Sequence, residues 1–171
     1  MKNTNQCLWL LGLSGAGKTS IANTLMADFR ANNKKCILLD GDVLRTGLNN
    51  NLGFSDEDRA ENVRRTAEVA KLFLAEGYCV IVALITPLES MRASNRAILG
   101  GKYIEIFIDT TLEICQARDP KGLYAKVARG EITNFTGIDS PFEIPQNADL
   151  VVNTKDRSIE ECVGIIFTKT F

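Results

Sequence analysis

Short apolar runs recur along the chain, and longer segments of mixed polarity separate them. A strand that is buried on both faces of a sheet reads as a continuous apolar run, whereas a helix needs a longer segment with apolar residues every three or four positions. Runs and longer segments alternate here, which is the pattern of β-α-β units. We therefore predict a parallel sheet with helices on both faces, a three-layer α/β/α sandwich. Its strands are expected at residues 7–11, 36–39, 79–84, 104–108 and 150–152.

The segments between the runs carry the helical period. Residues 55–76 give the longest example, with small and aliphatic side chains on one face and many Glu, Arg and Ala residues overall. Ser55 is a favourable N-cap, and Gly77 suits the turn that ends a helix. Further helices are expected at residues 19–29, from Thr111 through Gln116, and at residues 158–168.

A chain of 171 residues is long enough for one domain with a substantial core and short for two, so we expect a single domain over residues 1–171. Within it, residues 118–145 contain three prolines and several glycines. This composition disfavours long regular elements, and such segments can close over an active site. We interpret residues 118–145 as a mobile, partly helical lid.

Composition narrows the classes of partner. Lys and Arg total 20 against 21 for Asp and Glu, and no polybasic stretch occurs, so neither nucleic acid nor an anionic membrane is an expected partner. The first residues are polar and no apolar run approaches a membrane span, so we expect a cytoplasmic protein with a small-molecule ligand. The five cysteines are scattered without a C-x-x-C pair, which indicates neither a disulfide framework nor a zinc site. The sequence leaves the oligomeric state open, with a homodimer among the options.

Residues 12–19 read Gly-Leu-Ser-Gly-Ala-Gly-Lys-Thr and fit the phosphate-binding pattern G-x-x-x-x-G-K-[ST] at every fixed position. The glycines allow backbone N–H groups to surround a polyphosphate, Lys18 reaches the β- and γ-phosphates, and the Thr19 hydroxyl ligates Mg²⁺. The pattern stands between a predicted strand and a predicted helix, as the motif requires. We therefore expect a phosphate-binding-loop fold of the nucleotide-kinase type that binds ATP through Gly12, Ser14, Gly15, Ala16, Gly17, Lys18, Thr19 and Ser20.

Polar clusters follow the first four predicted strands. Residues 12–19 follow the first strand, Asp40-Gly41-Asp42 the second, Thr86-Pro87 the third and Asp109-Thr110 the fourth. Ligands of open parallel sheets bind at the carboxyl ends of the strands, so we expect these clusters to gather along one edge. The spacing of the two aspartates can aim both carboxylates into one cleft, where one holds hydrated Mg²⁺ and the other accepts a proton. Because the chain has no histidine, acid–base work falls to carboxylates, lysine or cysteine.

With these features the sequence resembles the adenylylsulfate kinases, which use ATP to phosphorylate the ribose 3′-hydroxyl of adenosine 5′-phosphosulfate. The resemblance runs nearly from end to end and includes several blocks that are distinctive of this family. The matching blocks are the phosphate-binding loop, Leu39-Asp-Gly-Asp42 with Arg45, Gly47-Leu48, Leu52-Gly-Phe-Ser55, Asp58-Arg59, Glu61-Asn62, Arg64-Arg65, Asp119-Pro-Lys-Gly-Leu-Tyr124 and Phe135-Thr-Gly-Ile-Asp139.

The resemblance implies a role for each matching position. Asp42 would be the base that accepts or orients the 3′-hydroxyl proton, and Asp40 would support Mg²⁺ together with Thr19. Lys121 would join Lys18 in stabilising charge on the transferring phosphoryl group, and Arg118 would lie over the ATP adenine. The two phenylalanines of the acceptor site would stack on either side of the acceptor base. That site would comprise Asp42, Arg45, Phe54, Arg59, Asn62, Ile85, Thr86, Lys121 and Phe135.

Three positions depart from the usual family pattern. Val43 and Thr46 stand where an asparagine and a histidine are usual, and Glu89 replaces a basic residue. If these side chains face the acceptor, they keep open the same 3′-kinase reaction on another modified nucleotide, for example cytidine diphosphoramidate. A non-catalytic nucleotide-binding regulator is the alternative from another class, and the intact Lys18 and Asp42 argue against it. The leading expectation is an ATP-dependent kinase of adenosine 5′-phosphosulfate in sulfate assimilation, with Mg²⁺ as cofactor.

Overall fold

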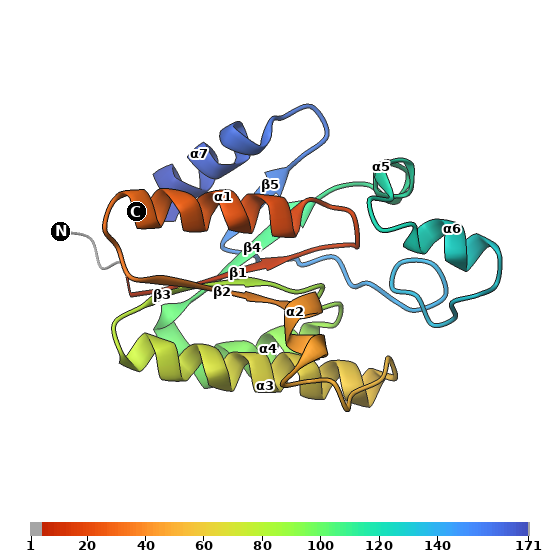
Figure 1. Cartoon of the computed structure of the whole chain (residues 1–171), viewed down its shortest axis with the longest axis horizontal. Helices are drawn as coiled ribbons and strands as arrows, with labels where there is room; N and C mark the ends of the chain where they lie inside the picture. The colour runs from red at the N-terminus through yellow and green to blue at the C-terminus, as the bar shows by residue number, and fades with distance from the viewer. Residues whose placement is uncertain (1–4, 171) are drawn as a thin grey trace.

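The structure is a computed structural model that describes residues 5–170. Its centre is a parallel sheet of five strands in the order β2-β3-β1-β4-β5, so that β1 lies between β3 and β4 (Figure 1). Each apolar run predicted to be a strand is one, which confirms the parallel sheet. The strands are β1 (Cys7–Leu11), β2 (Cys36–Asp40), β3 (Cys79–Ala83), β4 (Tyr103–Asp109) and β5 (Leu150–Asn153).

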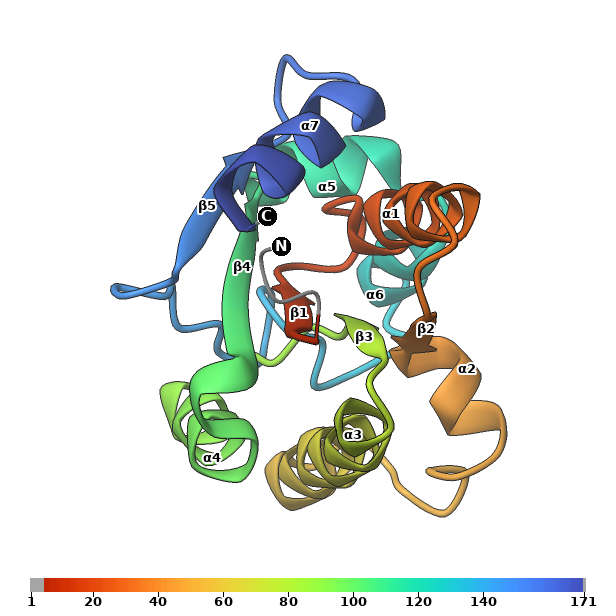
Figure 2. The same ribbon diagram turned by 90° about the vertical axis from the view of Figure 1, so that its left-hand side faces the viewer.

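Helices cover both faces of the sheet. Viewed along the strands in Figure 2, α1 and α7 lie on one side and α3 and α4 on the other, which confirms the three-layer α/β/α prediction. A short 3₁₀ helix, Gly100–Lys102, links α4 to β4. The α-helices are α1 (Lys18–Ala31), α2 (Gly41–Thr46), α3 (Asp56–Ala75), α4 (Glu89–Leu99), α5 (Leu112–Arg118), α6 (Leu123–Ala128) and α7 (Ile159–Thr170).

The caps predicted for the long helix are confirmed. Ser55 is the N-cap of α3, where its hydroxyl accepts a hydrogen bond from the backbone N–H of Asp58, and Gly77 follows the helix with a φ of +81°. Helix α4 was not predicted, although it is about three turns long. Its buried face includes Arg92 and Asn95 beside apolar residues, so the helical period of apolar side chains is incomplete.

The core has two layers that meet at β1. Side chains of successive strand residues point to opposite faces, so Leu8 and Leu10 pack with α1 and α7, whereas Trp9 and Leu11 pack with α3 and α4. Every residue of β1 is fully buried, and full burial of an aliphatic side chain typically contributes about 1.5–3 kcal/mol. The strand that carries the phosphate-binding loop is therefore buried along its whole length, as β3 is.

All five strands run in the same direction, so their carboxyl ends share one edge of the sheet. The phosphate-binding loop, α2, α5 and α6 lie at this edge, as does the returning chain between α6 and β5 (Figure 1). The predicted lid, residues 118–145, begins in the last turn of α5, contains α6 and continues without further helix or strand. Its mobility stays a prediction. Across residues 5–170 no helix is long and apolar enough to span a membrane.

Candidate active site

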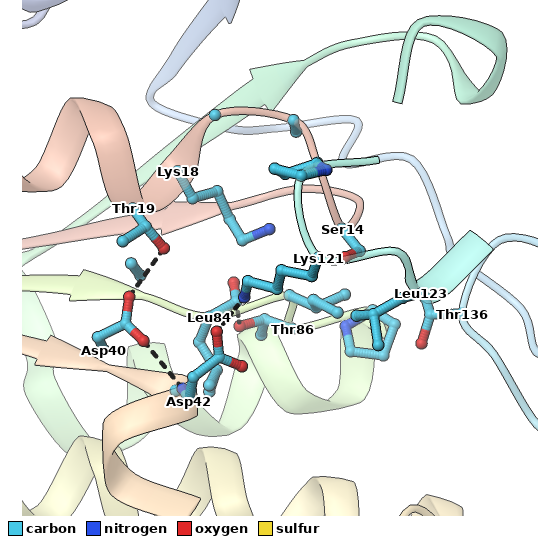
Figure 3. Close-up of a pocket in the computed structure, with 18 of the residues that line it drawn as sticks. Ser14, Lys18, Thr19, Asp40, Asp42, Leu84, Thr86, Lys121, Leu123 and Thr136 are labelled. Atoms are coloured by element: carbon cyan, nitrogen blue, oxygen red, sulfur yellow. Dashed lines mark hydrogen bonds and ion pairs between the residues drawn. The ribbon is translucent and has the colours of Figure 1, made fainter. Parts of the chain in front are cut away.

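A cavity of about 890 Å³ opens at the carboxyl edge of the sheet. Its wall is formed by the phosphate-binding loop, the ends of β2 and β3, α2, the start of α3, the lid and the start of α7. Figure 3 shows the part of it around Lys18, Asp42 and Lys121. The residues predicted to bind ATP, metal and acceptor all line it, apart from Gly12. Segments far apart in the sequence are therefore brought into one site, as the strand-end argument predicted.

Gly12 and Thr110 were expected at the site, but neither lines the cavity; both lie next to the phosphate-binding loop and shape it. Gly12 has a φ of +146°, and a Cβ there would lie 2.6 Å from the carbonyl oxygen of Ile108, so only glycine fits this turn. The cluster after β4 does not line the cavity either. Thr110 is buried and its hydroxyl lies 3.2 Å from the carbonyl oxygen of Ala16, which fixes the phosphate-binding loop to the end of β4.

The phosphate-binding loop leads directly into α1. Gly15 and Gly17 have φ values of +78° and +105°, which other residues rarely adopt. Gly17 is the N-cap, and no side chain caps the first turn of the helix. The backbone N–H groups of that turn therefore face the cavity without a side-chain acceptor, and the helix dipole favours an anion there.

Lys18 is the cation at the centre of this loop. Its ammonium donates hydrogen bonds of 2.8 Å to the carbonyl oxygens of Gly12 and Leu13, and the side chain is largely buried. Burial lowers the pKa of Lys18 to about 8, while nearby carboxylates on Asp42 and Asp40 partly oppose that shift. The ammonium is thus held beside the first turn of α1 by the loop that binds phosphate.

Asp40 connects the phosphate-binding loop to α2. One carboxylate oxygen accepts a hydrogen bond of 2.8 Å from the Thr19 hydroxyl, and the other accepts the backbone N–H of Asp42 at 2.9 Å (Figure 3). A hydroxyl and a carboxylate are the hard oxygen ligands that Mg²⁺ takes, and this ion commonly relies on one or two carboxylates with water and substrate phosphates. The pair Thr19 and Asp40 therefore fits such an ion. The described residues hold no group of three or more His, Cys, Asp or Glu side chains suited to a metal.

Asp42 and Lys121 meet across the cavity. The Lys121 ammonium, just before α6, forms an ion pair with the Asp42 carboxylate at the start of α2 (Figure 3). Both side chains are about half exposed or more, at 49% and 67%, so a ligand can replace either partner. Lys121 also acts on Lys18, because its charge helps to lower the pKa of the Lys18 ammonium. The predicted catalytic groups thus share one small region between the phosphate-binding loop and the lid.

Two aromatic rings, Phe54 and Phe135, line the part of the cavity where the acceptor base is predicted to bind. Phe54 is 62% exposed, and the Arg45 guanidinium lies 4.3 Å from its ring centre while donating to the carbonyl oxygens of Leu52 and Gly53. Phe135, in the lid, packs edge-on against Tyr124 with ring centres 5.0 Å apart. The Tyr124 hydroxyl donates to the carbonyl oxygen of Ser14 at 2.9 Å, which attaches α6 to the phosphate-binding loop.

Arg59 and Asn62 stand on the first turns of α3 and line the same end. Arg59 donates to the carbonyl oxygen of Phe54 at 2.9 Å and also bonds the carbonyl oxygen of Asn134 and the hydroxyl of Thr136. It therefore joins residues 47–55, the loop between α2 and α3, to the lid. Its guanidinium has more N–H donors than these partners use, so it can also donate to a phosphate. Burial lowers the pKa of Arg59. The Asn62 side-chain oxygen accepts a hydrogen bond of 2.8 Å from Asn49.

The opposite end of the cavity contains residues that the sequence did not indicate. Arg118 lines the cavity there, and its guanidinium donates to the hydroxyl and the carbonyl oxygen of Thr154 at 3.0 and 2.9 Å. Thr154 directly follows β5, so the rule of strand ends applied to the fifth strand would have found this segment. The additional lining residues here are Thr154, Arg157, Ser158, Ile159 and Cys162.

The three departures from the family pattern do not line the cavity. Val43 is 67% exposed, and the Thr46 hydroxyl donates to the Val43 carbonyl oxygen within α2. Glu89 opens α4, where its carboxylate accepts hydrogen bonds of 2.9 and 2.8 Å from Arg92 and Arg96. The condition that these side chains face the acceptor is thus not met by the cavity lining, and the Glu89 carboxylate pairs with arginines of its own helix.

Comparison with known proteins identifies the family. The family model for adenylylsulphate kinase matches residues 4–153. The adenylyl-sulfate kinase of Paraburkholderia xenovorans is 50% identical over 156 residues, which are 91% of this chain and 87% of that protein. The corresponding enzyme of Clostridium kluyveri is 47% identical over 159 residues, 93% of this chain and 80% of that protein.

Solved structures agree with this assignment. The Mycobacterium tuberculosis APS kinase CysC, in complex with AMPPNP and APS, superposes with a TM-score of 0.93 at 46% identity over 96% of each chain. A gluconokinase from Sinorhizobium meliloti, at 17% identity and a TM-score of 0.68, shares the fold alone. The family model, the similar curated proteins and the solved structure all point to the same family. The chain therefore belongs to the adenylylsulphate kinase family.

Proposed function

We propose that this protein transfers the γ-phosphoryl group of ATP to the ribose 3′-hydroxyl of adenosine 5′-phosphosulfate, giving 3′-phosphoadenosine 5′-phosphosulfate and ADP. The observation that carries the proposal is the shared cavity, which is lined by the phosphate-binding loop, by Phe54 and Phe135, and by the ion pair of Asp42 and Lys121. Phosphoryl transfer requires the donor and acceptor in line, with compensating charge between them.

The donor end binds the nucleotide through the phosphate-binding loop. The N–H groups at the start of α1 hold the phosphates, and Lys18 exchanges its carbonyl partners for the β- and γ-phosphate oxygens. Thr19 and Asp40 hold Mg²⁺, which supplies charge neutralisation at the phosphates when it is bound. Arg118, fixed by Thr154, borders the space for the adenine.

The transfer region uses Asp42 and Lys121. Asp42 accepts or orients the proton of the attacking 3′-hydroxyl, since the chain has no histidine to serve as a base. When substrates separate the ion pair, Lys121 becomes available to the oxygens of the transferring phosphoryl group. The same pair thus holds the lid near α2 before substrates bind and supplies both charges for the transfer.

The acceptor end holds the nucleotide by stacking and by polar contacts. Phe54 and Phe135 contact the two faces of the base, while Arg45, Arg59 and Asn62 contact its ribose and phosphate. Stacking tolerates any base, so it does not choose between adenine and cytosine. Val43, Thr46 and Glu89 are not among the residues that line the cavity, so the cavity lining itself contains none of the departures that suggested a cytidine acceptor.

The test is a comparison of kcat/KM for adenosine 5′-phosphosulfate and cytidine diphosphoramidate with saturating ATP and Mg²⁺. We expect adenosine 5′-phosphosulfate to be the better substrate and the product to carry its new phosphate at the 3′ position, as detected by phosphorus NMR. A clear preference for the cytidine compound would replace the proposed acceptor. ATP binding without turnover of either compound would instead indicate a regulator.

A further inference from the structure

Thr86 occupies an unusual position in the acceptor end of the cavity. It follows β3, lines the cavity and is only 1% exposed (Figure 3). Its φ of +48° places a β-branched residue in the left-handed region, which persists only where surrounding contacts hold it. Arg92, on α4, donates to the carbonyl oxygens of Thr86 and Pro87 at 3.3 Å each.

The second contact comes from the central strand of the sheet. The indole N–H of Trp9, fully buried in β1, donates a hydrogen bond of 2.8 Å to the Thr86 hydroxyl oxygen. An indole nitrogen is only ever a donor, whereas a hydroxyl can donate or accept. The direction of this bond is therefore fixed, and the single hydrogen of the Thr86 hydroxyl points elsewhere.

That hydrogen has a weak acceptor within the protein. The acceptor is the carbonyl oxygen of Leu84 at 3.4 Å, which is long for a hydroxyl donor. An anionic oxygen in the cavity would be a better acceptor, because hydrogen bonds to charged groups are shorter and stronger. Rotation of the hydroxyl about its C–O bond is enough to make the exchange while the bond from Trp9 persists.

We propose that Trp9 is a positioning residue for the acceptor: it holds the Thr86 hydroxyl so that its hydrogen is donated to an anionic oxygen on the acceptor's 5′-phosphate group. This inference rests on the proposed function, because it uses Thr86 as part of the acceptor site. It assigns to β1 a role at both ends of the cavity, since the phosphate-binding loop continues from the same strand.

A double-mutant cycle tests the coupling between the two residues. Trp9→Phe removes the N–H and keeps an aromatic ring, Thr86→Val removes the hydroxyl at similar volume, and Thr86→Ser keeps the hydroxyl. We expect each of the first two variants to raise the acceptor KM roughly 3- to 10-fold, with kcat and the KM for ATP within about twofold of the unmodified enzyme. The double variant should match Thr86→Val, and Thr86→Ser should remain close to the unmodified enzyme.

Tyr103→Phe is the matched control. The Tyr103 ring packs against Trp9 at 5.9 Å between centres, and its hydroxyl donates to Glu105 rather than to Thr86. The control should leave the acceptor KM unchanged. If Trp9→Phe raised the acceptor KM by the same factor with and without the Thr86→Val substitution, the proposal would be overturned, because the tryptophan would then act through packing.

A normal acceptor KM for Thr86→Val would overturn the proposal independently, even if Trp9→Phe failed to fold. The substrate preference of the unmodified enzyme tells a failure of this proposal apart from a failure of the proposed function. If it prefers cytidine diphosphoramidate, the proposed acceptor is wrong, and the same cycle is measured on that compound, whose diphosphate carries the anionic oxygen.

Discussion

At the scale of single residues, the polar groups of the cavity are held by protein partners that a substrate can replace. The Lys18 ammonium rests on two carbonyl oxygens, and the Lys121 ammonium pairs with Asp42. These contacts keep the charges in place before ligands arrive, and pre-positioned charges need little reorganisation during the reaction. Substitution of such residues should therefore affect turnover more than folding.

Lys18→Ala should nearly abolish turnover, because it removes the cation that contacts the β- and γ-phosphates, and such contacts are typically worth several kcal/mol in the transition state. The thermal unfolding temperature should stay close to that of the unmodified protein. Steady-state kinetics measures the loss, with Lys71→Ala on the exposed side of α3 as the control. Near-normal kcat with unchanged ATP affinity would rule out the role assigned to Lys18.

Asp42→Asn keeps the shape of the side chain and removes the carboxylate that accepts or orients the hydroxyl proton. We expect kcat to fall by about 10²-fold or more while the dissociation constant for ATP changes little. Rapid-quench measurement of a single turnover isolates the chemical step, and calorimetry supplies the ATP affinity. A single-turnover rate equal to that of the unmodified enzyme would contradict the assignment of Asp42 as the base.

At the scale of elements, the N-terminus of α3 follows the loop of residues 47–55 and is capped by Ser55. The Ser55 hydroxyl accepts the N–H of Asp58, and the Asp58 carboxylate accepts the N–H of Gly53 at 2.9 Å. Ser55→Ala should lower the free energy of unfolding by about 1 kcal/mol, because the first turn of α3 loses its side-chain acceptor. Urea unfolding measures the change, and Ser55→Asp, which retains an acceptor, should restore stability. Equal stability of Ser55→Ala and the unmodified protein would show that water replaces the cap.

The mobility of the lid, residues 118–145, is predicted from the sequence and needs a measurement in solution. Its contacts with the rest of the protein include Arg59 to residues 134 and 136, Tyr124 to Ser14 and the ion pair of Lys121. We expect residues 118–145 to exchange amide hydrogens faster than the sheet in the free protein, and to slow when ATP and the acceptor bind, because closure excludes water. Mass spectrometry of exchange follows both states. Equally slow exchange with and without ligands would mean that the segment is a fixed wall.

At the scale of the whole molecule, ligands should stabilise the fold, because the cavity is built from segments spread along the chain. ATP with Mg²⁺ at about 100 times its dissociation constant should add roughly 2.7 kcal/mol to the free energy of unfolding. Calorimetry of thermal unfolding measures this, and removal of Mg²⁺ by a chelator should reduce the gain if Thr19 and Asp40 hold the ion. If the gain in stability were unchanged with the chelator present, the assignment of Mg²⁺ to the donor site would be wrong.

Light scattering of the same samples tests whether the protein forms a homodimer.

Much of the fold followed from local patterns. The strands were predictable because a run such as residues 7–11 is short and apolar throughout, which is typical of a strand buried on both faces. Helix α3 was predictable from its period and caps. Helix α4 was not, because Arg92 and Asn95 lie on its buried face and interrupt the apolar pattern. The burial of Arg92 depends on partners outside its helix, the carbonyl oxygens of Thr86 and Pro87.

The sequence by itself determined the parallel sheet, the phosphate-binding loop and the residues that meet at the carboxyl edge, because these depend on local spacing and on the common direction of the strands. Only the tertiary structure decided the strand order, which places β1 beside β3 and so brings Trp9 to Thr86. It also decided that Thr154 borders the cavity and that Glu89 does not. Such facts depend on which side chains meet across distant segments, and packing, rather than local pattern, selects those partners.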